Sequence, residues 1–161
     1  MPVTVPRPGT RGSRFPKFPG PIAGLMSRMQ TSMFRRRRGG RTPGGVPTLL
    51  LETIGARTGE TRRAVLGYLE DGPGAWLIMA SLAGTARNPG WLHNLGKNPA
   101  ATVEFGDGRR VHVDATSLED VELDSAWQRI KVEAPEYAKY LSKTDRQIAV
   151  LRLREVAQRA D

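Results

Sequence analysis

The hydrophobic positions of this 161-residue chain follow a strand period over most of its length. From residue 48 on, short apolar runs separated by turn residues predict strands. Gly, Pro and Asp clusters at 71–74 and 106–108 supply turns between neighbouring runs. We therefore expect an α+β fold in which a mainly antiparallel sheet closes as a barrel, not a doubly wound sheet. The predicted strands cover about residues 48–54, 62–70, 75–81, 101–105, 110–115 and 148–153.

A helical period marks the segment from Pro21 to Arg38. Four arginines suit its C-terminal end, and Gly39-Gly40 predict the stop. Two interpretations stay open: the helix packs on the domain with its basic end in solvent, or it attaches to an anionic membrane surface. Its apolar stripe consists of Ile22, Leu25, Met26, Met29 and Met33.

Further helices are predicted after the third strand and between the last two strands. Asn88-Pro89 is typical of an N-cap followed by proline at the first helical position, and this short helix should end near Leu95. Residues 117–120 resemble a capping box. The helix that follows should break at Pro135, before a second short helix.

The charge is distributed unevenly. The chain carries 25 Lys+Arg against 16 Asp+Glu, a formal net charge of +9, and residues 1–46 hold ten basic and no acidic residues. We therefore divide the chain into a basic N-terminal arm with an amphipathic helix (1–46) and a near-neutral domain (47–161). Six prolines within residues 1–21 predict an extended or disordered arm. Because the basic excess is confined to the arm, we do not expect a nucleic-acid partner.

Several classes are excluded by composition. The chain has no cysteine, and its two histidines are not spaced as a zinc pair, so we expect no metal site. No apolar run reaches the ~18 residues of a membrane span, and no secretory signal is visible. We predict a cytoplasmic protein, with a peripheral position on the inner membrane face as the alternative that the amphipathic helix allows.

The strongest candidate for chemistry is the turn between the first two predicted strands. Gly55 and Gly59 permit backbone angles with φ > 0, and Arg57, Arg62 and Arg63 concentrate cationic charge. Such a loop offers backbone N–H groups and guanidinium forks to a phosphate or carboxylate. An ordinary hairpin with a solvated tip is the alternative. The spacing of the glycines fits neither the phosphate-binding lysine motif nor the dinucleotide fingerprint.

Several short motifs, in order, resemble one family. They are Gly55-x-x-Thr58-Gly59, Ala80-Ser81, Asn88-Pro89-x-Trp91-x-x-Asn94-Leu95, Asn98-Pro99 and Thr144-Asp145-Arg146-Gln147-Ile148. Over roughly residues 47–153 the chain resembles the deazaflavin (F420)-dependent nitroreductase family of actinobacteria. The resemblance implies a split β-barrel with a few helices packed around it, and residues 47–161 as its coenzyme-binding domain.

The resemblance also implies a coenzyme site. The turn and the next strand would hold the phosphate and acidic tail of coenzyme F420, with FMN as the alternative cofactor. Two departures stand out: Leu82 replaces the lysine of many members, and Glu60 places an acid beside an acidic ligand. The implied cofactor-binding residues are Arg57, Thr58, Gly59, Glu60, Arg62, Arg63, Ala64, Val65, Leu66, Met79, Ala80, Ser81, Leu82, Ala83, Asn88, Pro89, Trp91 and Asn94.

The implied reaction is hydride transfer from the reduced deazaflavin to a small hydrophobic acceptor: a quinone, an activated enone or a nitroaromatic. Ser81, Tyr137 and Tyr140 are the candidate catalytic hydroxyls, which would stabilise or protonate the product anion. The two tyrosines share a helical face, and could equally only pack there. Two other functions stay open: an FMN-binding split-barrel oxidoreductase, and a non-catalytic cofactor- or lipid-binding module at the membrane. The oligomeric state is not predicted.

Overall fold

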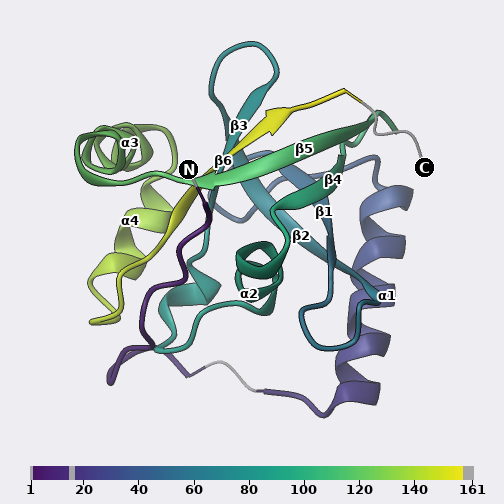
Figure 1. The fold of residues 1–161 in the computed structure, drawn as a ribbon, viewed down its shortest axis with the longest axis horizontal. Coiled ribbons are helices and arrows are strands. Elements are labelled where there is room, and N and C mark those ends of the chain that lie inside the picture. The colour runs from purple at the N-terminus through teal and green to yellow at the C-terminus, as the bar shows by residue number, and fades with distance from the viewer. Residues whose placement is uncertain (1, 15–16, 158–161) are drawn as a thin grey trace.

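Six antiparallel strands form a closed barrel in the computed structural model, which describes residues 2–14 and 17–157. Their order around the barrel is β1-β2-β3-β6-β5-β4, so β1 closes the sheet by pairing with β4 (Figure 1). The predicted α+β antiparallel barrel is confirmed. The strands are β1 (Thr48–Ile54), β2 (Thr61–Glu70), β3 (Ala75–Met79), β4 (Ala100–Glu104), β5 (Arg110–Ser117) and β6 (Val150–Glu155).

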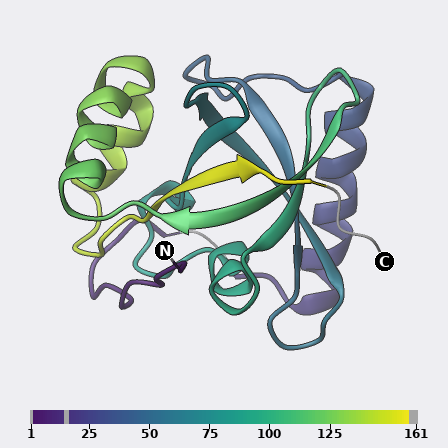
Figure 2. The same cartoon turned by 45° about the horizontal axis from the view of Figure 1, so that its top comes forward.

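The helices lie around this barrel. The long helix α1 stands on one side, and α3 and α4 lie on the opposite side in both views (Figures 1 and 2). The elements are α1 (Gly20–Arg36), the 3₁₀ turn η1 (Leu82–Gly84), α2 (Gly90–Lys97), α3 (Asp120–Glu133) and α4 (Pro135–Leu141).

Two apolar cores follow from this arrangement. Inward-facing side chains of the strands, such as Leu51 and Val103, fill the barrel, and Leu92 and Leu95 of α2 belong to the same core. A second core, which includes Ile130, joins α3 and α4 to the outer face of the sheet. Burying such side chains stabilises the fold by roughly 1.5–3 kcal/mol each.

Most of the apolar stripe of α1 does not face the barrel, and of its five residues Met26 alone is half-buried. The helix docks through its other side, where Thr31 and Phe34 are buried and the Ser27 hydroxyl donates to the Arg63 carbonyl over 3.0 Å. The helical period of apolar residues identifies the apolar face of a helix, but it does not determine which face packs against the rest of the protein. The exposed fractions of the stripe residues are 47% for Ile22, 59% for Leu25, 56% for Met29 and 43% for Met33.

Residues 2–14 form an extended segment that is hydrogen-bonded to the body. The Thr4 amide donates to Ser117 Oγ over 2.8 Å, and the Ser13 amide donates to the Gly84 carbonyl over 2.9 Å. Val3 and Val5 pack against the barrel core. The sequence predicted an extended or a disordered arm, and residues 2–14 are extended. Residues 1, 15, 16 and 158–161 lie outside the described residues, Pro16 of the arm among them.

Two predicted helix caps are wrong. Helix α2 begins at Gly90 with Pro89 as its N-cap residue, and the Asn88 side chain bonds elsewhere. Helix α3 begins at Asp120 without a side-chain cap, because Ser117 is still part of β5 and its hydroxyl accepts from the arm. The third strand also ends at Met79, two residues before its predicted end.

Within the described residues, no helix has both the length and the apolar character that a membrane crossing requires.

Candidate active site

The turn between β1 and β2 is tight and internally bonded. The Gly55 amide donates to the Glu60 carbonyl over 2.7 Å, and the Gly59 amide donates to the Gly55 carbonyl over 2.9 Å. Gly59 has a φ of +72°, in the left-handed region that glycine adopts without strain. The turn thereby presents Arg57 and Thr58 on its outer side.

Helix α2 fixes the position of this turn. The Asn94 side chain accepts from the Ala56 amide over 2.9 Å and donates to Thr53 Oγ1 over 3.0 Å. The Lys97 ammonium donates to the Ala56 carbonyl over 2.7 Å. Asn94, predicted as a coenzyme residue, therefore also holds the turn in place.

A cationic cavity of about 650 Å³ opens between this turn and α2. Lys17, Arg57, Arg62 and Arg87 bring four positive side chains to its wall. Among the described residues that line it, none is acidic. An open cavity with this lining suits an anion such as a phosphate. Its other lining residues are Gly55, Ala56, Thr58, Asn88, Gly90, His93 and Asn94.

A second cavity of about 420 Å³ adjoins the first, and Arg62 and Gly90 line both. Its walls are mainly apolar and come from the N-terminal half of α1, the first residues of β2, η1 and the start of α2. Its volume and apolar lining suit a flat ring system. Its lining residues are Phe18, Ala23, Met26, Ser27, Gln30, Thr53, Arg62, Arg63, Ala64, Val65, Leu66, Leu82, Pro89, Gly90 and Trp91.

A third cavity, of about 660 Å³, lies between α1 and the start of β2, so that Arg62 lines all three. Arg28, Arg62 and Arg63 make it cationic, whereas Glu60 contributes one carboxylate. This carboxylate lies 3.4 Å from the Arg62 guanidinium. Both side chains are more than half exposed, so the pair is weak.

A buried guanidinium holds the loop that follows β3. Arg146 is 4% exposed and donates to the carbonyls of Ala80, Ser81 and Thr85 and to Asn88 Oδ1, over 2.9–3.1 Å. Among the described residues no carboxylate pairs with it. Burial lowers the pKa of Arg146, and the oxygens around it stabilise its charge.

This loop is conformationally unusual. Leu82, Ala83 and Gly84 have φ values of +39°, +53° and +76°, which cost the two non-glycine residues free energy. The contacts of Arg146 therefore stabilise a strained turn that places Leu82 in the apolar cavity. On its far side the Asn88 side chain donates to the Pro6 carbonyl over 2.7 Å, so the arm supports the same loop.

The structure brings most of the predicted cofactor-binding residues together along these cavities. The residues that line at least one of them are Arg57, Thr58, Glu60, Arg62, Arg63, Ala64, Val65, Leu66, Leu82, Asn88, Pro89, Trp91 and Asn94. Five others do not line them: Gly59 shapes the turn, Met79 and Ala80 are buried in the cores, Ser81 is buried at Arg146, and Ala83 lies in η1.

Of the predicted catalytic hydroxyls, those of the two tyrosines lie outside these cavities. Tyr137 is buried against the second core, and the Gly67 amide donates a hydrogen bond to its hydroxyl. Burial, with the nearby Glu136 charge, raises the pKa of Tyr137 to about 12, so the group stays protonated. Its ring meets Tyr140 edge-on at 5.9 Å. Neither tyrosine lines the three cavities, and their catalytic roles stay predictions.

Several lining residues were not predicted from the sequence. Phe18, Met26 and Gln30 come from α1 and the segment before it, and Lys17 comes from the same segment. The only sequence signal there was the helical stripe, which was assigned to packing or to a membrane. Arg87 stands beside the quoted motif residue Asn88, and Arg146 belongs to a quoted motif, but no role for either followed from the pattern.

A closed antiparallel barrel with cationic and apolar cavities side by side along its second strand defines a split-barrel protein whose site suits an anionic ligand with a flat ring. The family model described as F420H(2)-dependent quinone reductase matches residues 26–155. The chain therefore belongs to the F420H(2)-dependent quinone reductase family.

Similar proteins agree with this assignment. The chain is 42% identical to the F420H(2)-dependent quinone reductase Rv1261c of Mycobacterium tuberculosis over 118 residues, covering 71% of this chain and 78% of the relative. A solved F420-H2 dependent reductase, FDR-A, is 33% identical with a TM-score of 0.59, over 66% of this chain and 92% of that one. The heme storage protein HutZ of Vibrio cholerae, 18% identical with a TM-score of 0.51 over 82% and 92% of the chains, shares the fold alone.

The family assignment identifies the chain as an oxidoreductase that uses coenzyme F420 and transfers hydride to a quinone-type acceptor. Within the described residues, no group of three or more His, Asp or Glu side chains lies close enough together to hold a metal ion.

Proposed function

We propose that the joined cationic and apolar cavities bind reduced F420, and that the enzyme passes its hydride to a quinone held beside β2. One observation carries this proposal: the two cavities meet at Arg62. On one side of Arg62 the described lining residues are cationic and include no acid, and on the other side they are mainly apolar. A ligand with a flat ring and an anionic tail matches that change. An activated enone and a nitroaromatic are the alternative acceptors of the same hydride transfer.

The residues divide the work between the two ends of the ligand. Arg57, Arg62 and Arg87 would hold the phosphate, and Arg28 and Arg63 lie where further tail carboxylates would reach. Apolar side chains from β2, η1 and α2 would flank the ring and exclude water. When bound, the coenzyme supplies the hydride, and the protein supplies orientation.

The proton donor is a separate part of the proposal. Ser81, Tyr137 and Tyr140 are the candidates. The raised pKa of Tyr137 keeps its hydroxyl protonated at neutral pH but makes it a weaker acid than a free phenol. Because the Tyr137 hydroxyl lies at Gly67 on β2, its proton would have to pass this strand residue to reach the acceptor. Tyr137→Phe should lower kcat with little change in coenzyme affinity if the hydroxyl serves the reaction. Unchanged kcat would remove Tyr137 from the mechanism.

Titration of the purified protein with F420, followed by fluorescence quenching, tests the coenzyme site. Saturable binding, which weakens in Arg57→Gln and persists in the exposed control Arg154→Gln, is the expected result. Steady-state oxidation of reduced F420 with menadione then tests turnover. Binding of FMN in place of F420, or coenzyme binding without turnover, would contradict the proposal.

We also propose that α1 docks the enzyme on an anionic membrane surface, where lipophilic quinones reside. Its exposed apolar stripe is accompanied by Arg28 and by the exposed residues Arg36 and Arg37, which are the charges and apolar groups that such a surface attracts. The cytoplasmic protein would then be peripheral on the inner face.

Vesicle sedimentation tests this second proposal. The double variant Leu25→Gln, Met29→Gln should lose binding to vesicles that contain phosphatidylglycerol, because both side chains lie in solvent and their change leaves the fold intact. Val121→Gln, Val132→Gln is a matched control on α3, whose two valines are 77% and 81% exposed. Equal binding of all three proteins would exclude α1 as the docking face.

A further inference from the structure

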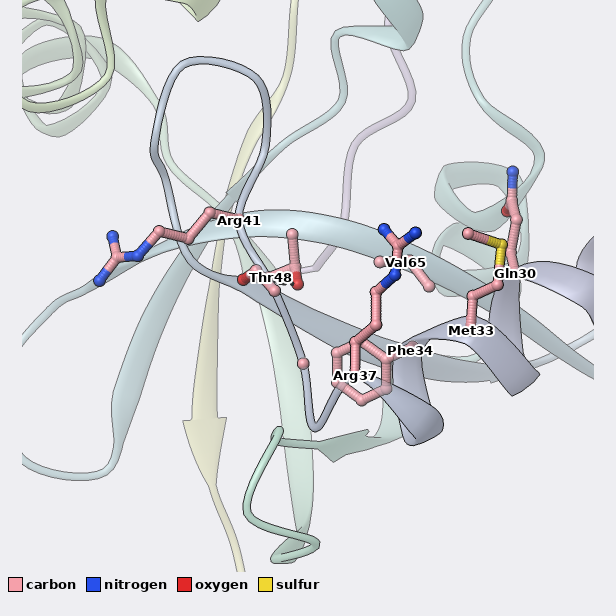
Figure 3. A pocket seen from close by; sticks show the side chains of 9 residues that line it. Gln30, Met33, Phe34, Arg37, Arg41, Thr48 and Val65 are labelled. Atoms are coloured by element: carbon pink, nitrogen blue, oxygen red, sulfur yellow. Dashed lines mark hydrogen bonds between the residues drawn. The ribbon is translucent and has the colours of Figure 1, made fainter.

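A fourth cavity, of about 330 Å³, lies at the C-terminal end of α1 and has no role in the coenzyme site described above (Figure 3). We call it the α1 cavity. Its walls come from α1, from residues 39–41, and from β1 and β2. The lining residues are Gln30, Met33, Phe34, Arg37, Gly39, Gly40, Arg41, Thr48 and Val65.

The wall of the α1 cavity is held by several contacts. The Gly40 carbonyl accepts from both the amide and the hydroxyl of Thr48, over 3.1 and 3.0 Å, and the Gly39 amide donates to the Phe34 carbonyl over 2.8 Å. Gly39 has a φ of +93°, and a side chain there would also meet Gly106 at 3.0 Å. The backbone therefore passes close to the barrel only because no side chain intervenes, and the cavity is preformed.

The α1 cavity adjoins the apolar end of the coenzyme groove. Gln30 and Val65 line both cavities, which places the two side by side at these residues. Val65 is also one of the residues proposed to flank the deazaflavin ring. Hydride transfer requires donor and acceptor atoms about 3–3.5 Å apart, and a cavity that adjoins the ring site at Val65 allows such an approach.

One cation is directed at the junction. In Figure 3 the Arg37 side chain extends from the end of α1 toward Val65, whereas the Arg41 guanidinium points away. Arg41 donates to the Gly45 carbonyl over 2.6 Å. Arg37 forms no ion pair with any described residue, and no described residue of the lining is acidic. Its guanidinium is therefore available to an oxygen atom in the cavity.

We propose that the α1 cavity is the acceptor site and that Arg37 binds a quinone oxygen. This inference rests on the proposed function. Addition of a hydride with its two electrons to the quinone oxidises the coenzyme and leaves negative charge on an oxygen of the hydroquinone anion. A proton from solvent or from a neighbouring hydroxyl then neutralises that oxygen. A guanidinium at this position stabilises the charge as it develops.

The position of Met33 adds a route of entry. Met33 lines the α1 cavity and also belongs to the exposed apolar stripe of α1. A lipophilic acceptor can pass from an apolar surface along this side chain into the cavity, without crossing the cationic end of the groove. Phe34, buried at the base of the cavity, offers a ring face for the quinone.

The test uses Arg37→Gln, with Arg154→Gln as its control, because Arg154 on β6 is exposed and lines none of the four cavities. Each protein is assayed in detergent-free buffer with reduced F420 and two acceptors, menadione and an anionic naphthoquinone sulfonate. We expect Arg37→Gln to lower kcat/KM about tenfold for menadione, the size of a lost charge-assisted hydrogen bond, and more for the sulfonate. Affinity for F420 should not change.

A second variant fills the cavity without altering charge. Met33→Trp lies at an exposed position and should raise KM for both quinones while F420 affinity stays constant. If wild type turns over and both variants match Arg154→Gln, the α1 cavity is not the acceptor site, although the proposed function stands. If wild type neither binds F420 nor turns over, the proposed function fails first.

Discussion

At the scale of single residues, Arg146 connects the fold to the groove. Its guanidinium satisfies three backbone carbonyls and one side-chain amide that would otherwise be buried without partners. Lysine carries the same charge but cannot present a planar fork of donors. The residue therefore contributes by geometry as much as by charge.

We predict that Arg146→Gln lowers the free energy of unfolding by about 2–3 kcal/mol, because several buried oxygens lose their donor. Arg146→Lys should recover part of this loss. F420 affinity should fall in both, since Leu82 leaves its position in the apolar cavity. Urea unfolding and fluorescence titration measure the two effects. Arg154→Lys, an exposed change on the neighbouring strand β6, is the control, and equal stability of all variants would refute the role.

A second prediction at the scale of single residues concerns Glu60. Its carboxylate lies beside Arg62, where it competes with an anionic ligand for the guanidinium. Glu60→Gln should therefore tighten F420 binding roughly two- to fivefold, in keeping with the small free energy of an exposed ion pair. The effect should shrink at high salt. Glu70→Gln at the far end of β2 serves as the control, and an unchanged affinity would show that Glu60 points away from the tail.

At the scale of elements, α1 is joined to the barrel by charged side chains. Glu104 on β4 accepts from Arg35 of α1 over 3.0 Å and from Arg110 of β5 over 2.8 Å. Glu52 on β1 accepts from Arg110 over 2.9 Å and from Arg63 over 3.0 Å. The hydrogen bond from Arg35 is the main reason that the pKa of Glu104 is lowered. Burial opposes the charge of Glu52, but its arginines lower its pKa as well.

Acid should loosen this attachment. Because the folded-state pKa values of Glu52 and Glu104 lie below their unfolded values of about 4.3, the stabilisation is present above that pH and is lost as pH falls through the lowered values. Urea midpoints measured between pH 7 and pH 3 should decline in the wild type. They should decline less in Glu104→Gln, which is less stable at neutral pH by about 1–2 kcal/mol. Parallel declines would contradict the assignment.

The sequence predicted the strands well because each strand shows alternating apolar and polar residues or a short apolar run. Such patterns depend on neighbouring residues alone. The sequence did not predict the orientation of α1, where small and polar residues such as Ser27 and Thr31 meet the barrel while Met29 and Met33 are exposed. The cap at Asn88 failed because a distant partner, Arg146, takes its side chain. The turn residues Arg57 to Arg63 were predictable because the motif is local, whereas the walls from α1 depend on tertiary contacts.

At the scale of the whole molecule, residues 2–14 connect parts of the chain that lie far apart in sequence. They contact β5 through Thr4, α2 through Val5 near Gly96, and the loop of Arg146 through Pro6 and Ser13. The backbone amides of Thr10 and Arg11 donate to Asp145 over 2.9 Å. Hydrogen bonds from the Thr10 side chain and then the Arg11 amide lower the pKa of Asp145 to about 2.

Removal of residues 2–14 tests whether this connection matters for the groove. The deletion exposes apolar surface of the barrel core that Val3 and Val5 cover, so thermal unfolding should occur several degrees lower. It also removes the Pro6 and Ser13 contacts from the loop that carries Leu82 and Asn88, so F420 affinity should fall. Val3→Ala, Val5→Ala separates the two effects, because it reduces apolar packing but keeps every backbone contact. That variant should lose stability and keep its F420 affinity. A deletion protein with unchanged affinity would show that Arg146 alone holds the loop.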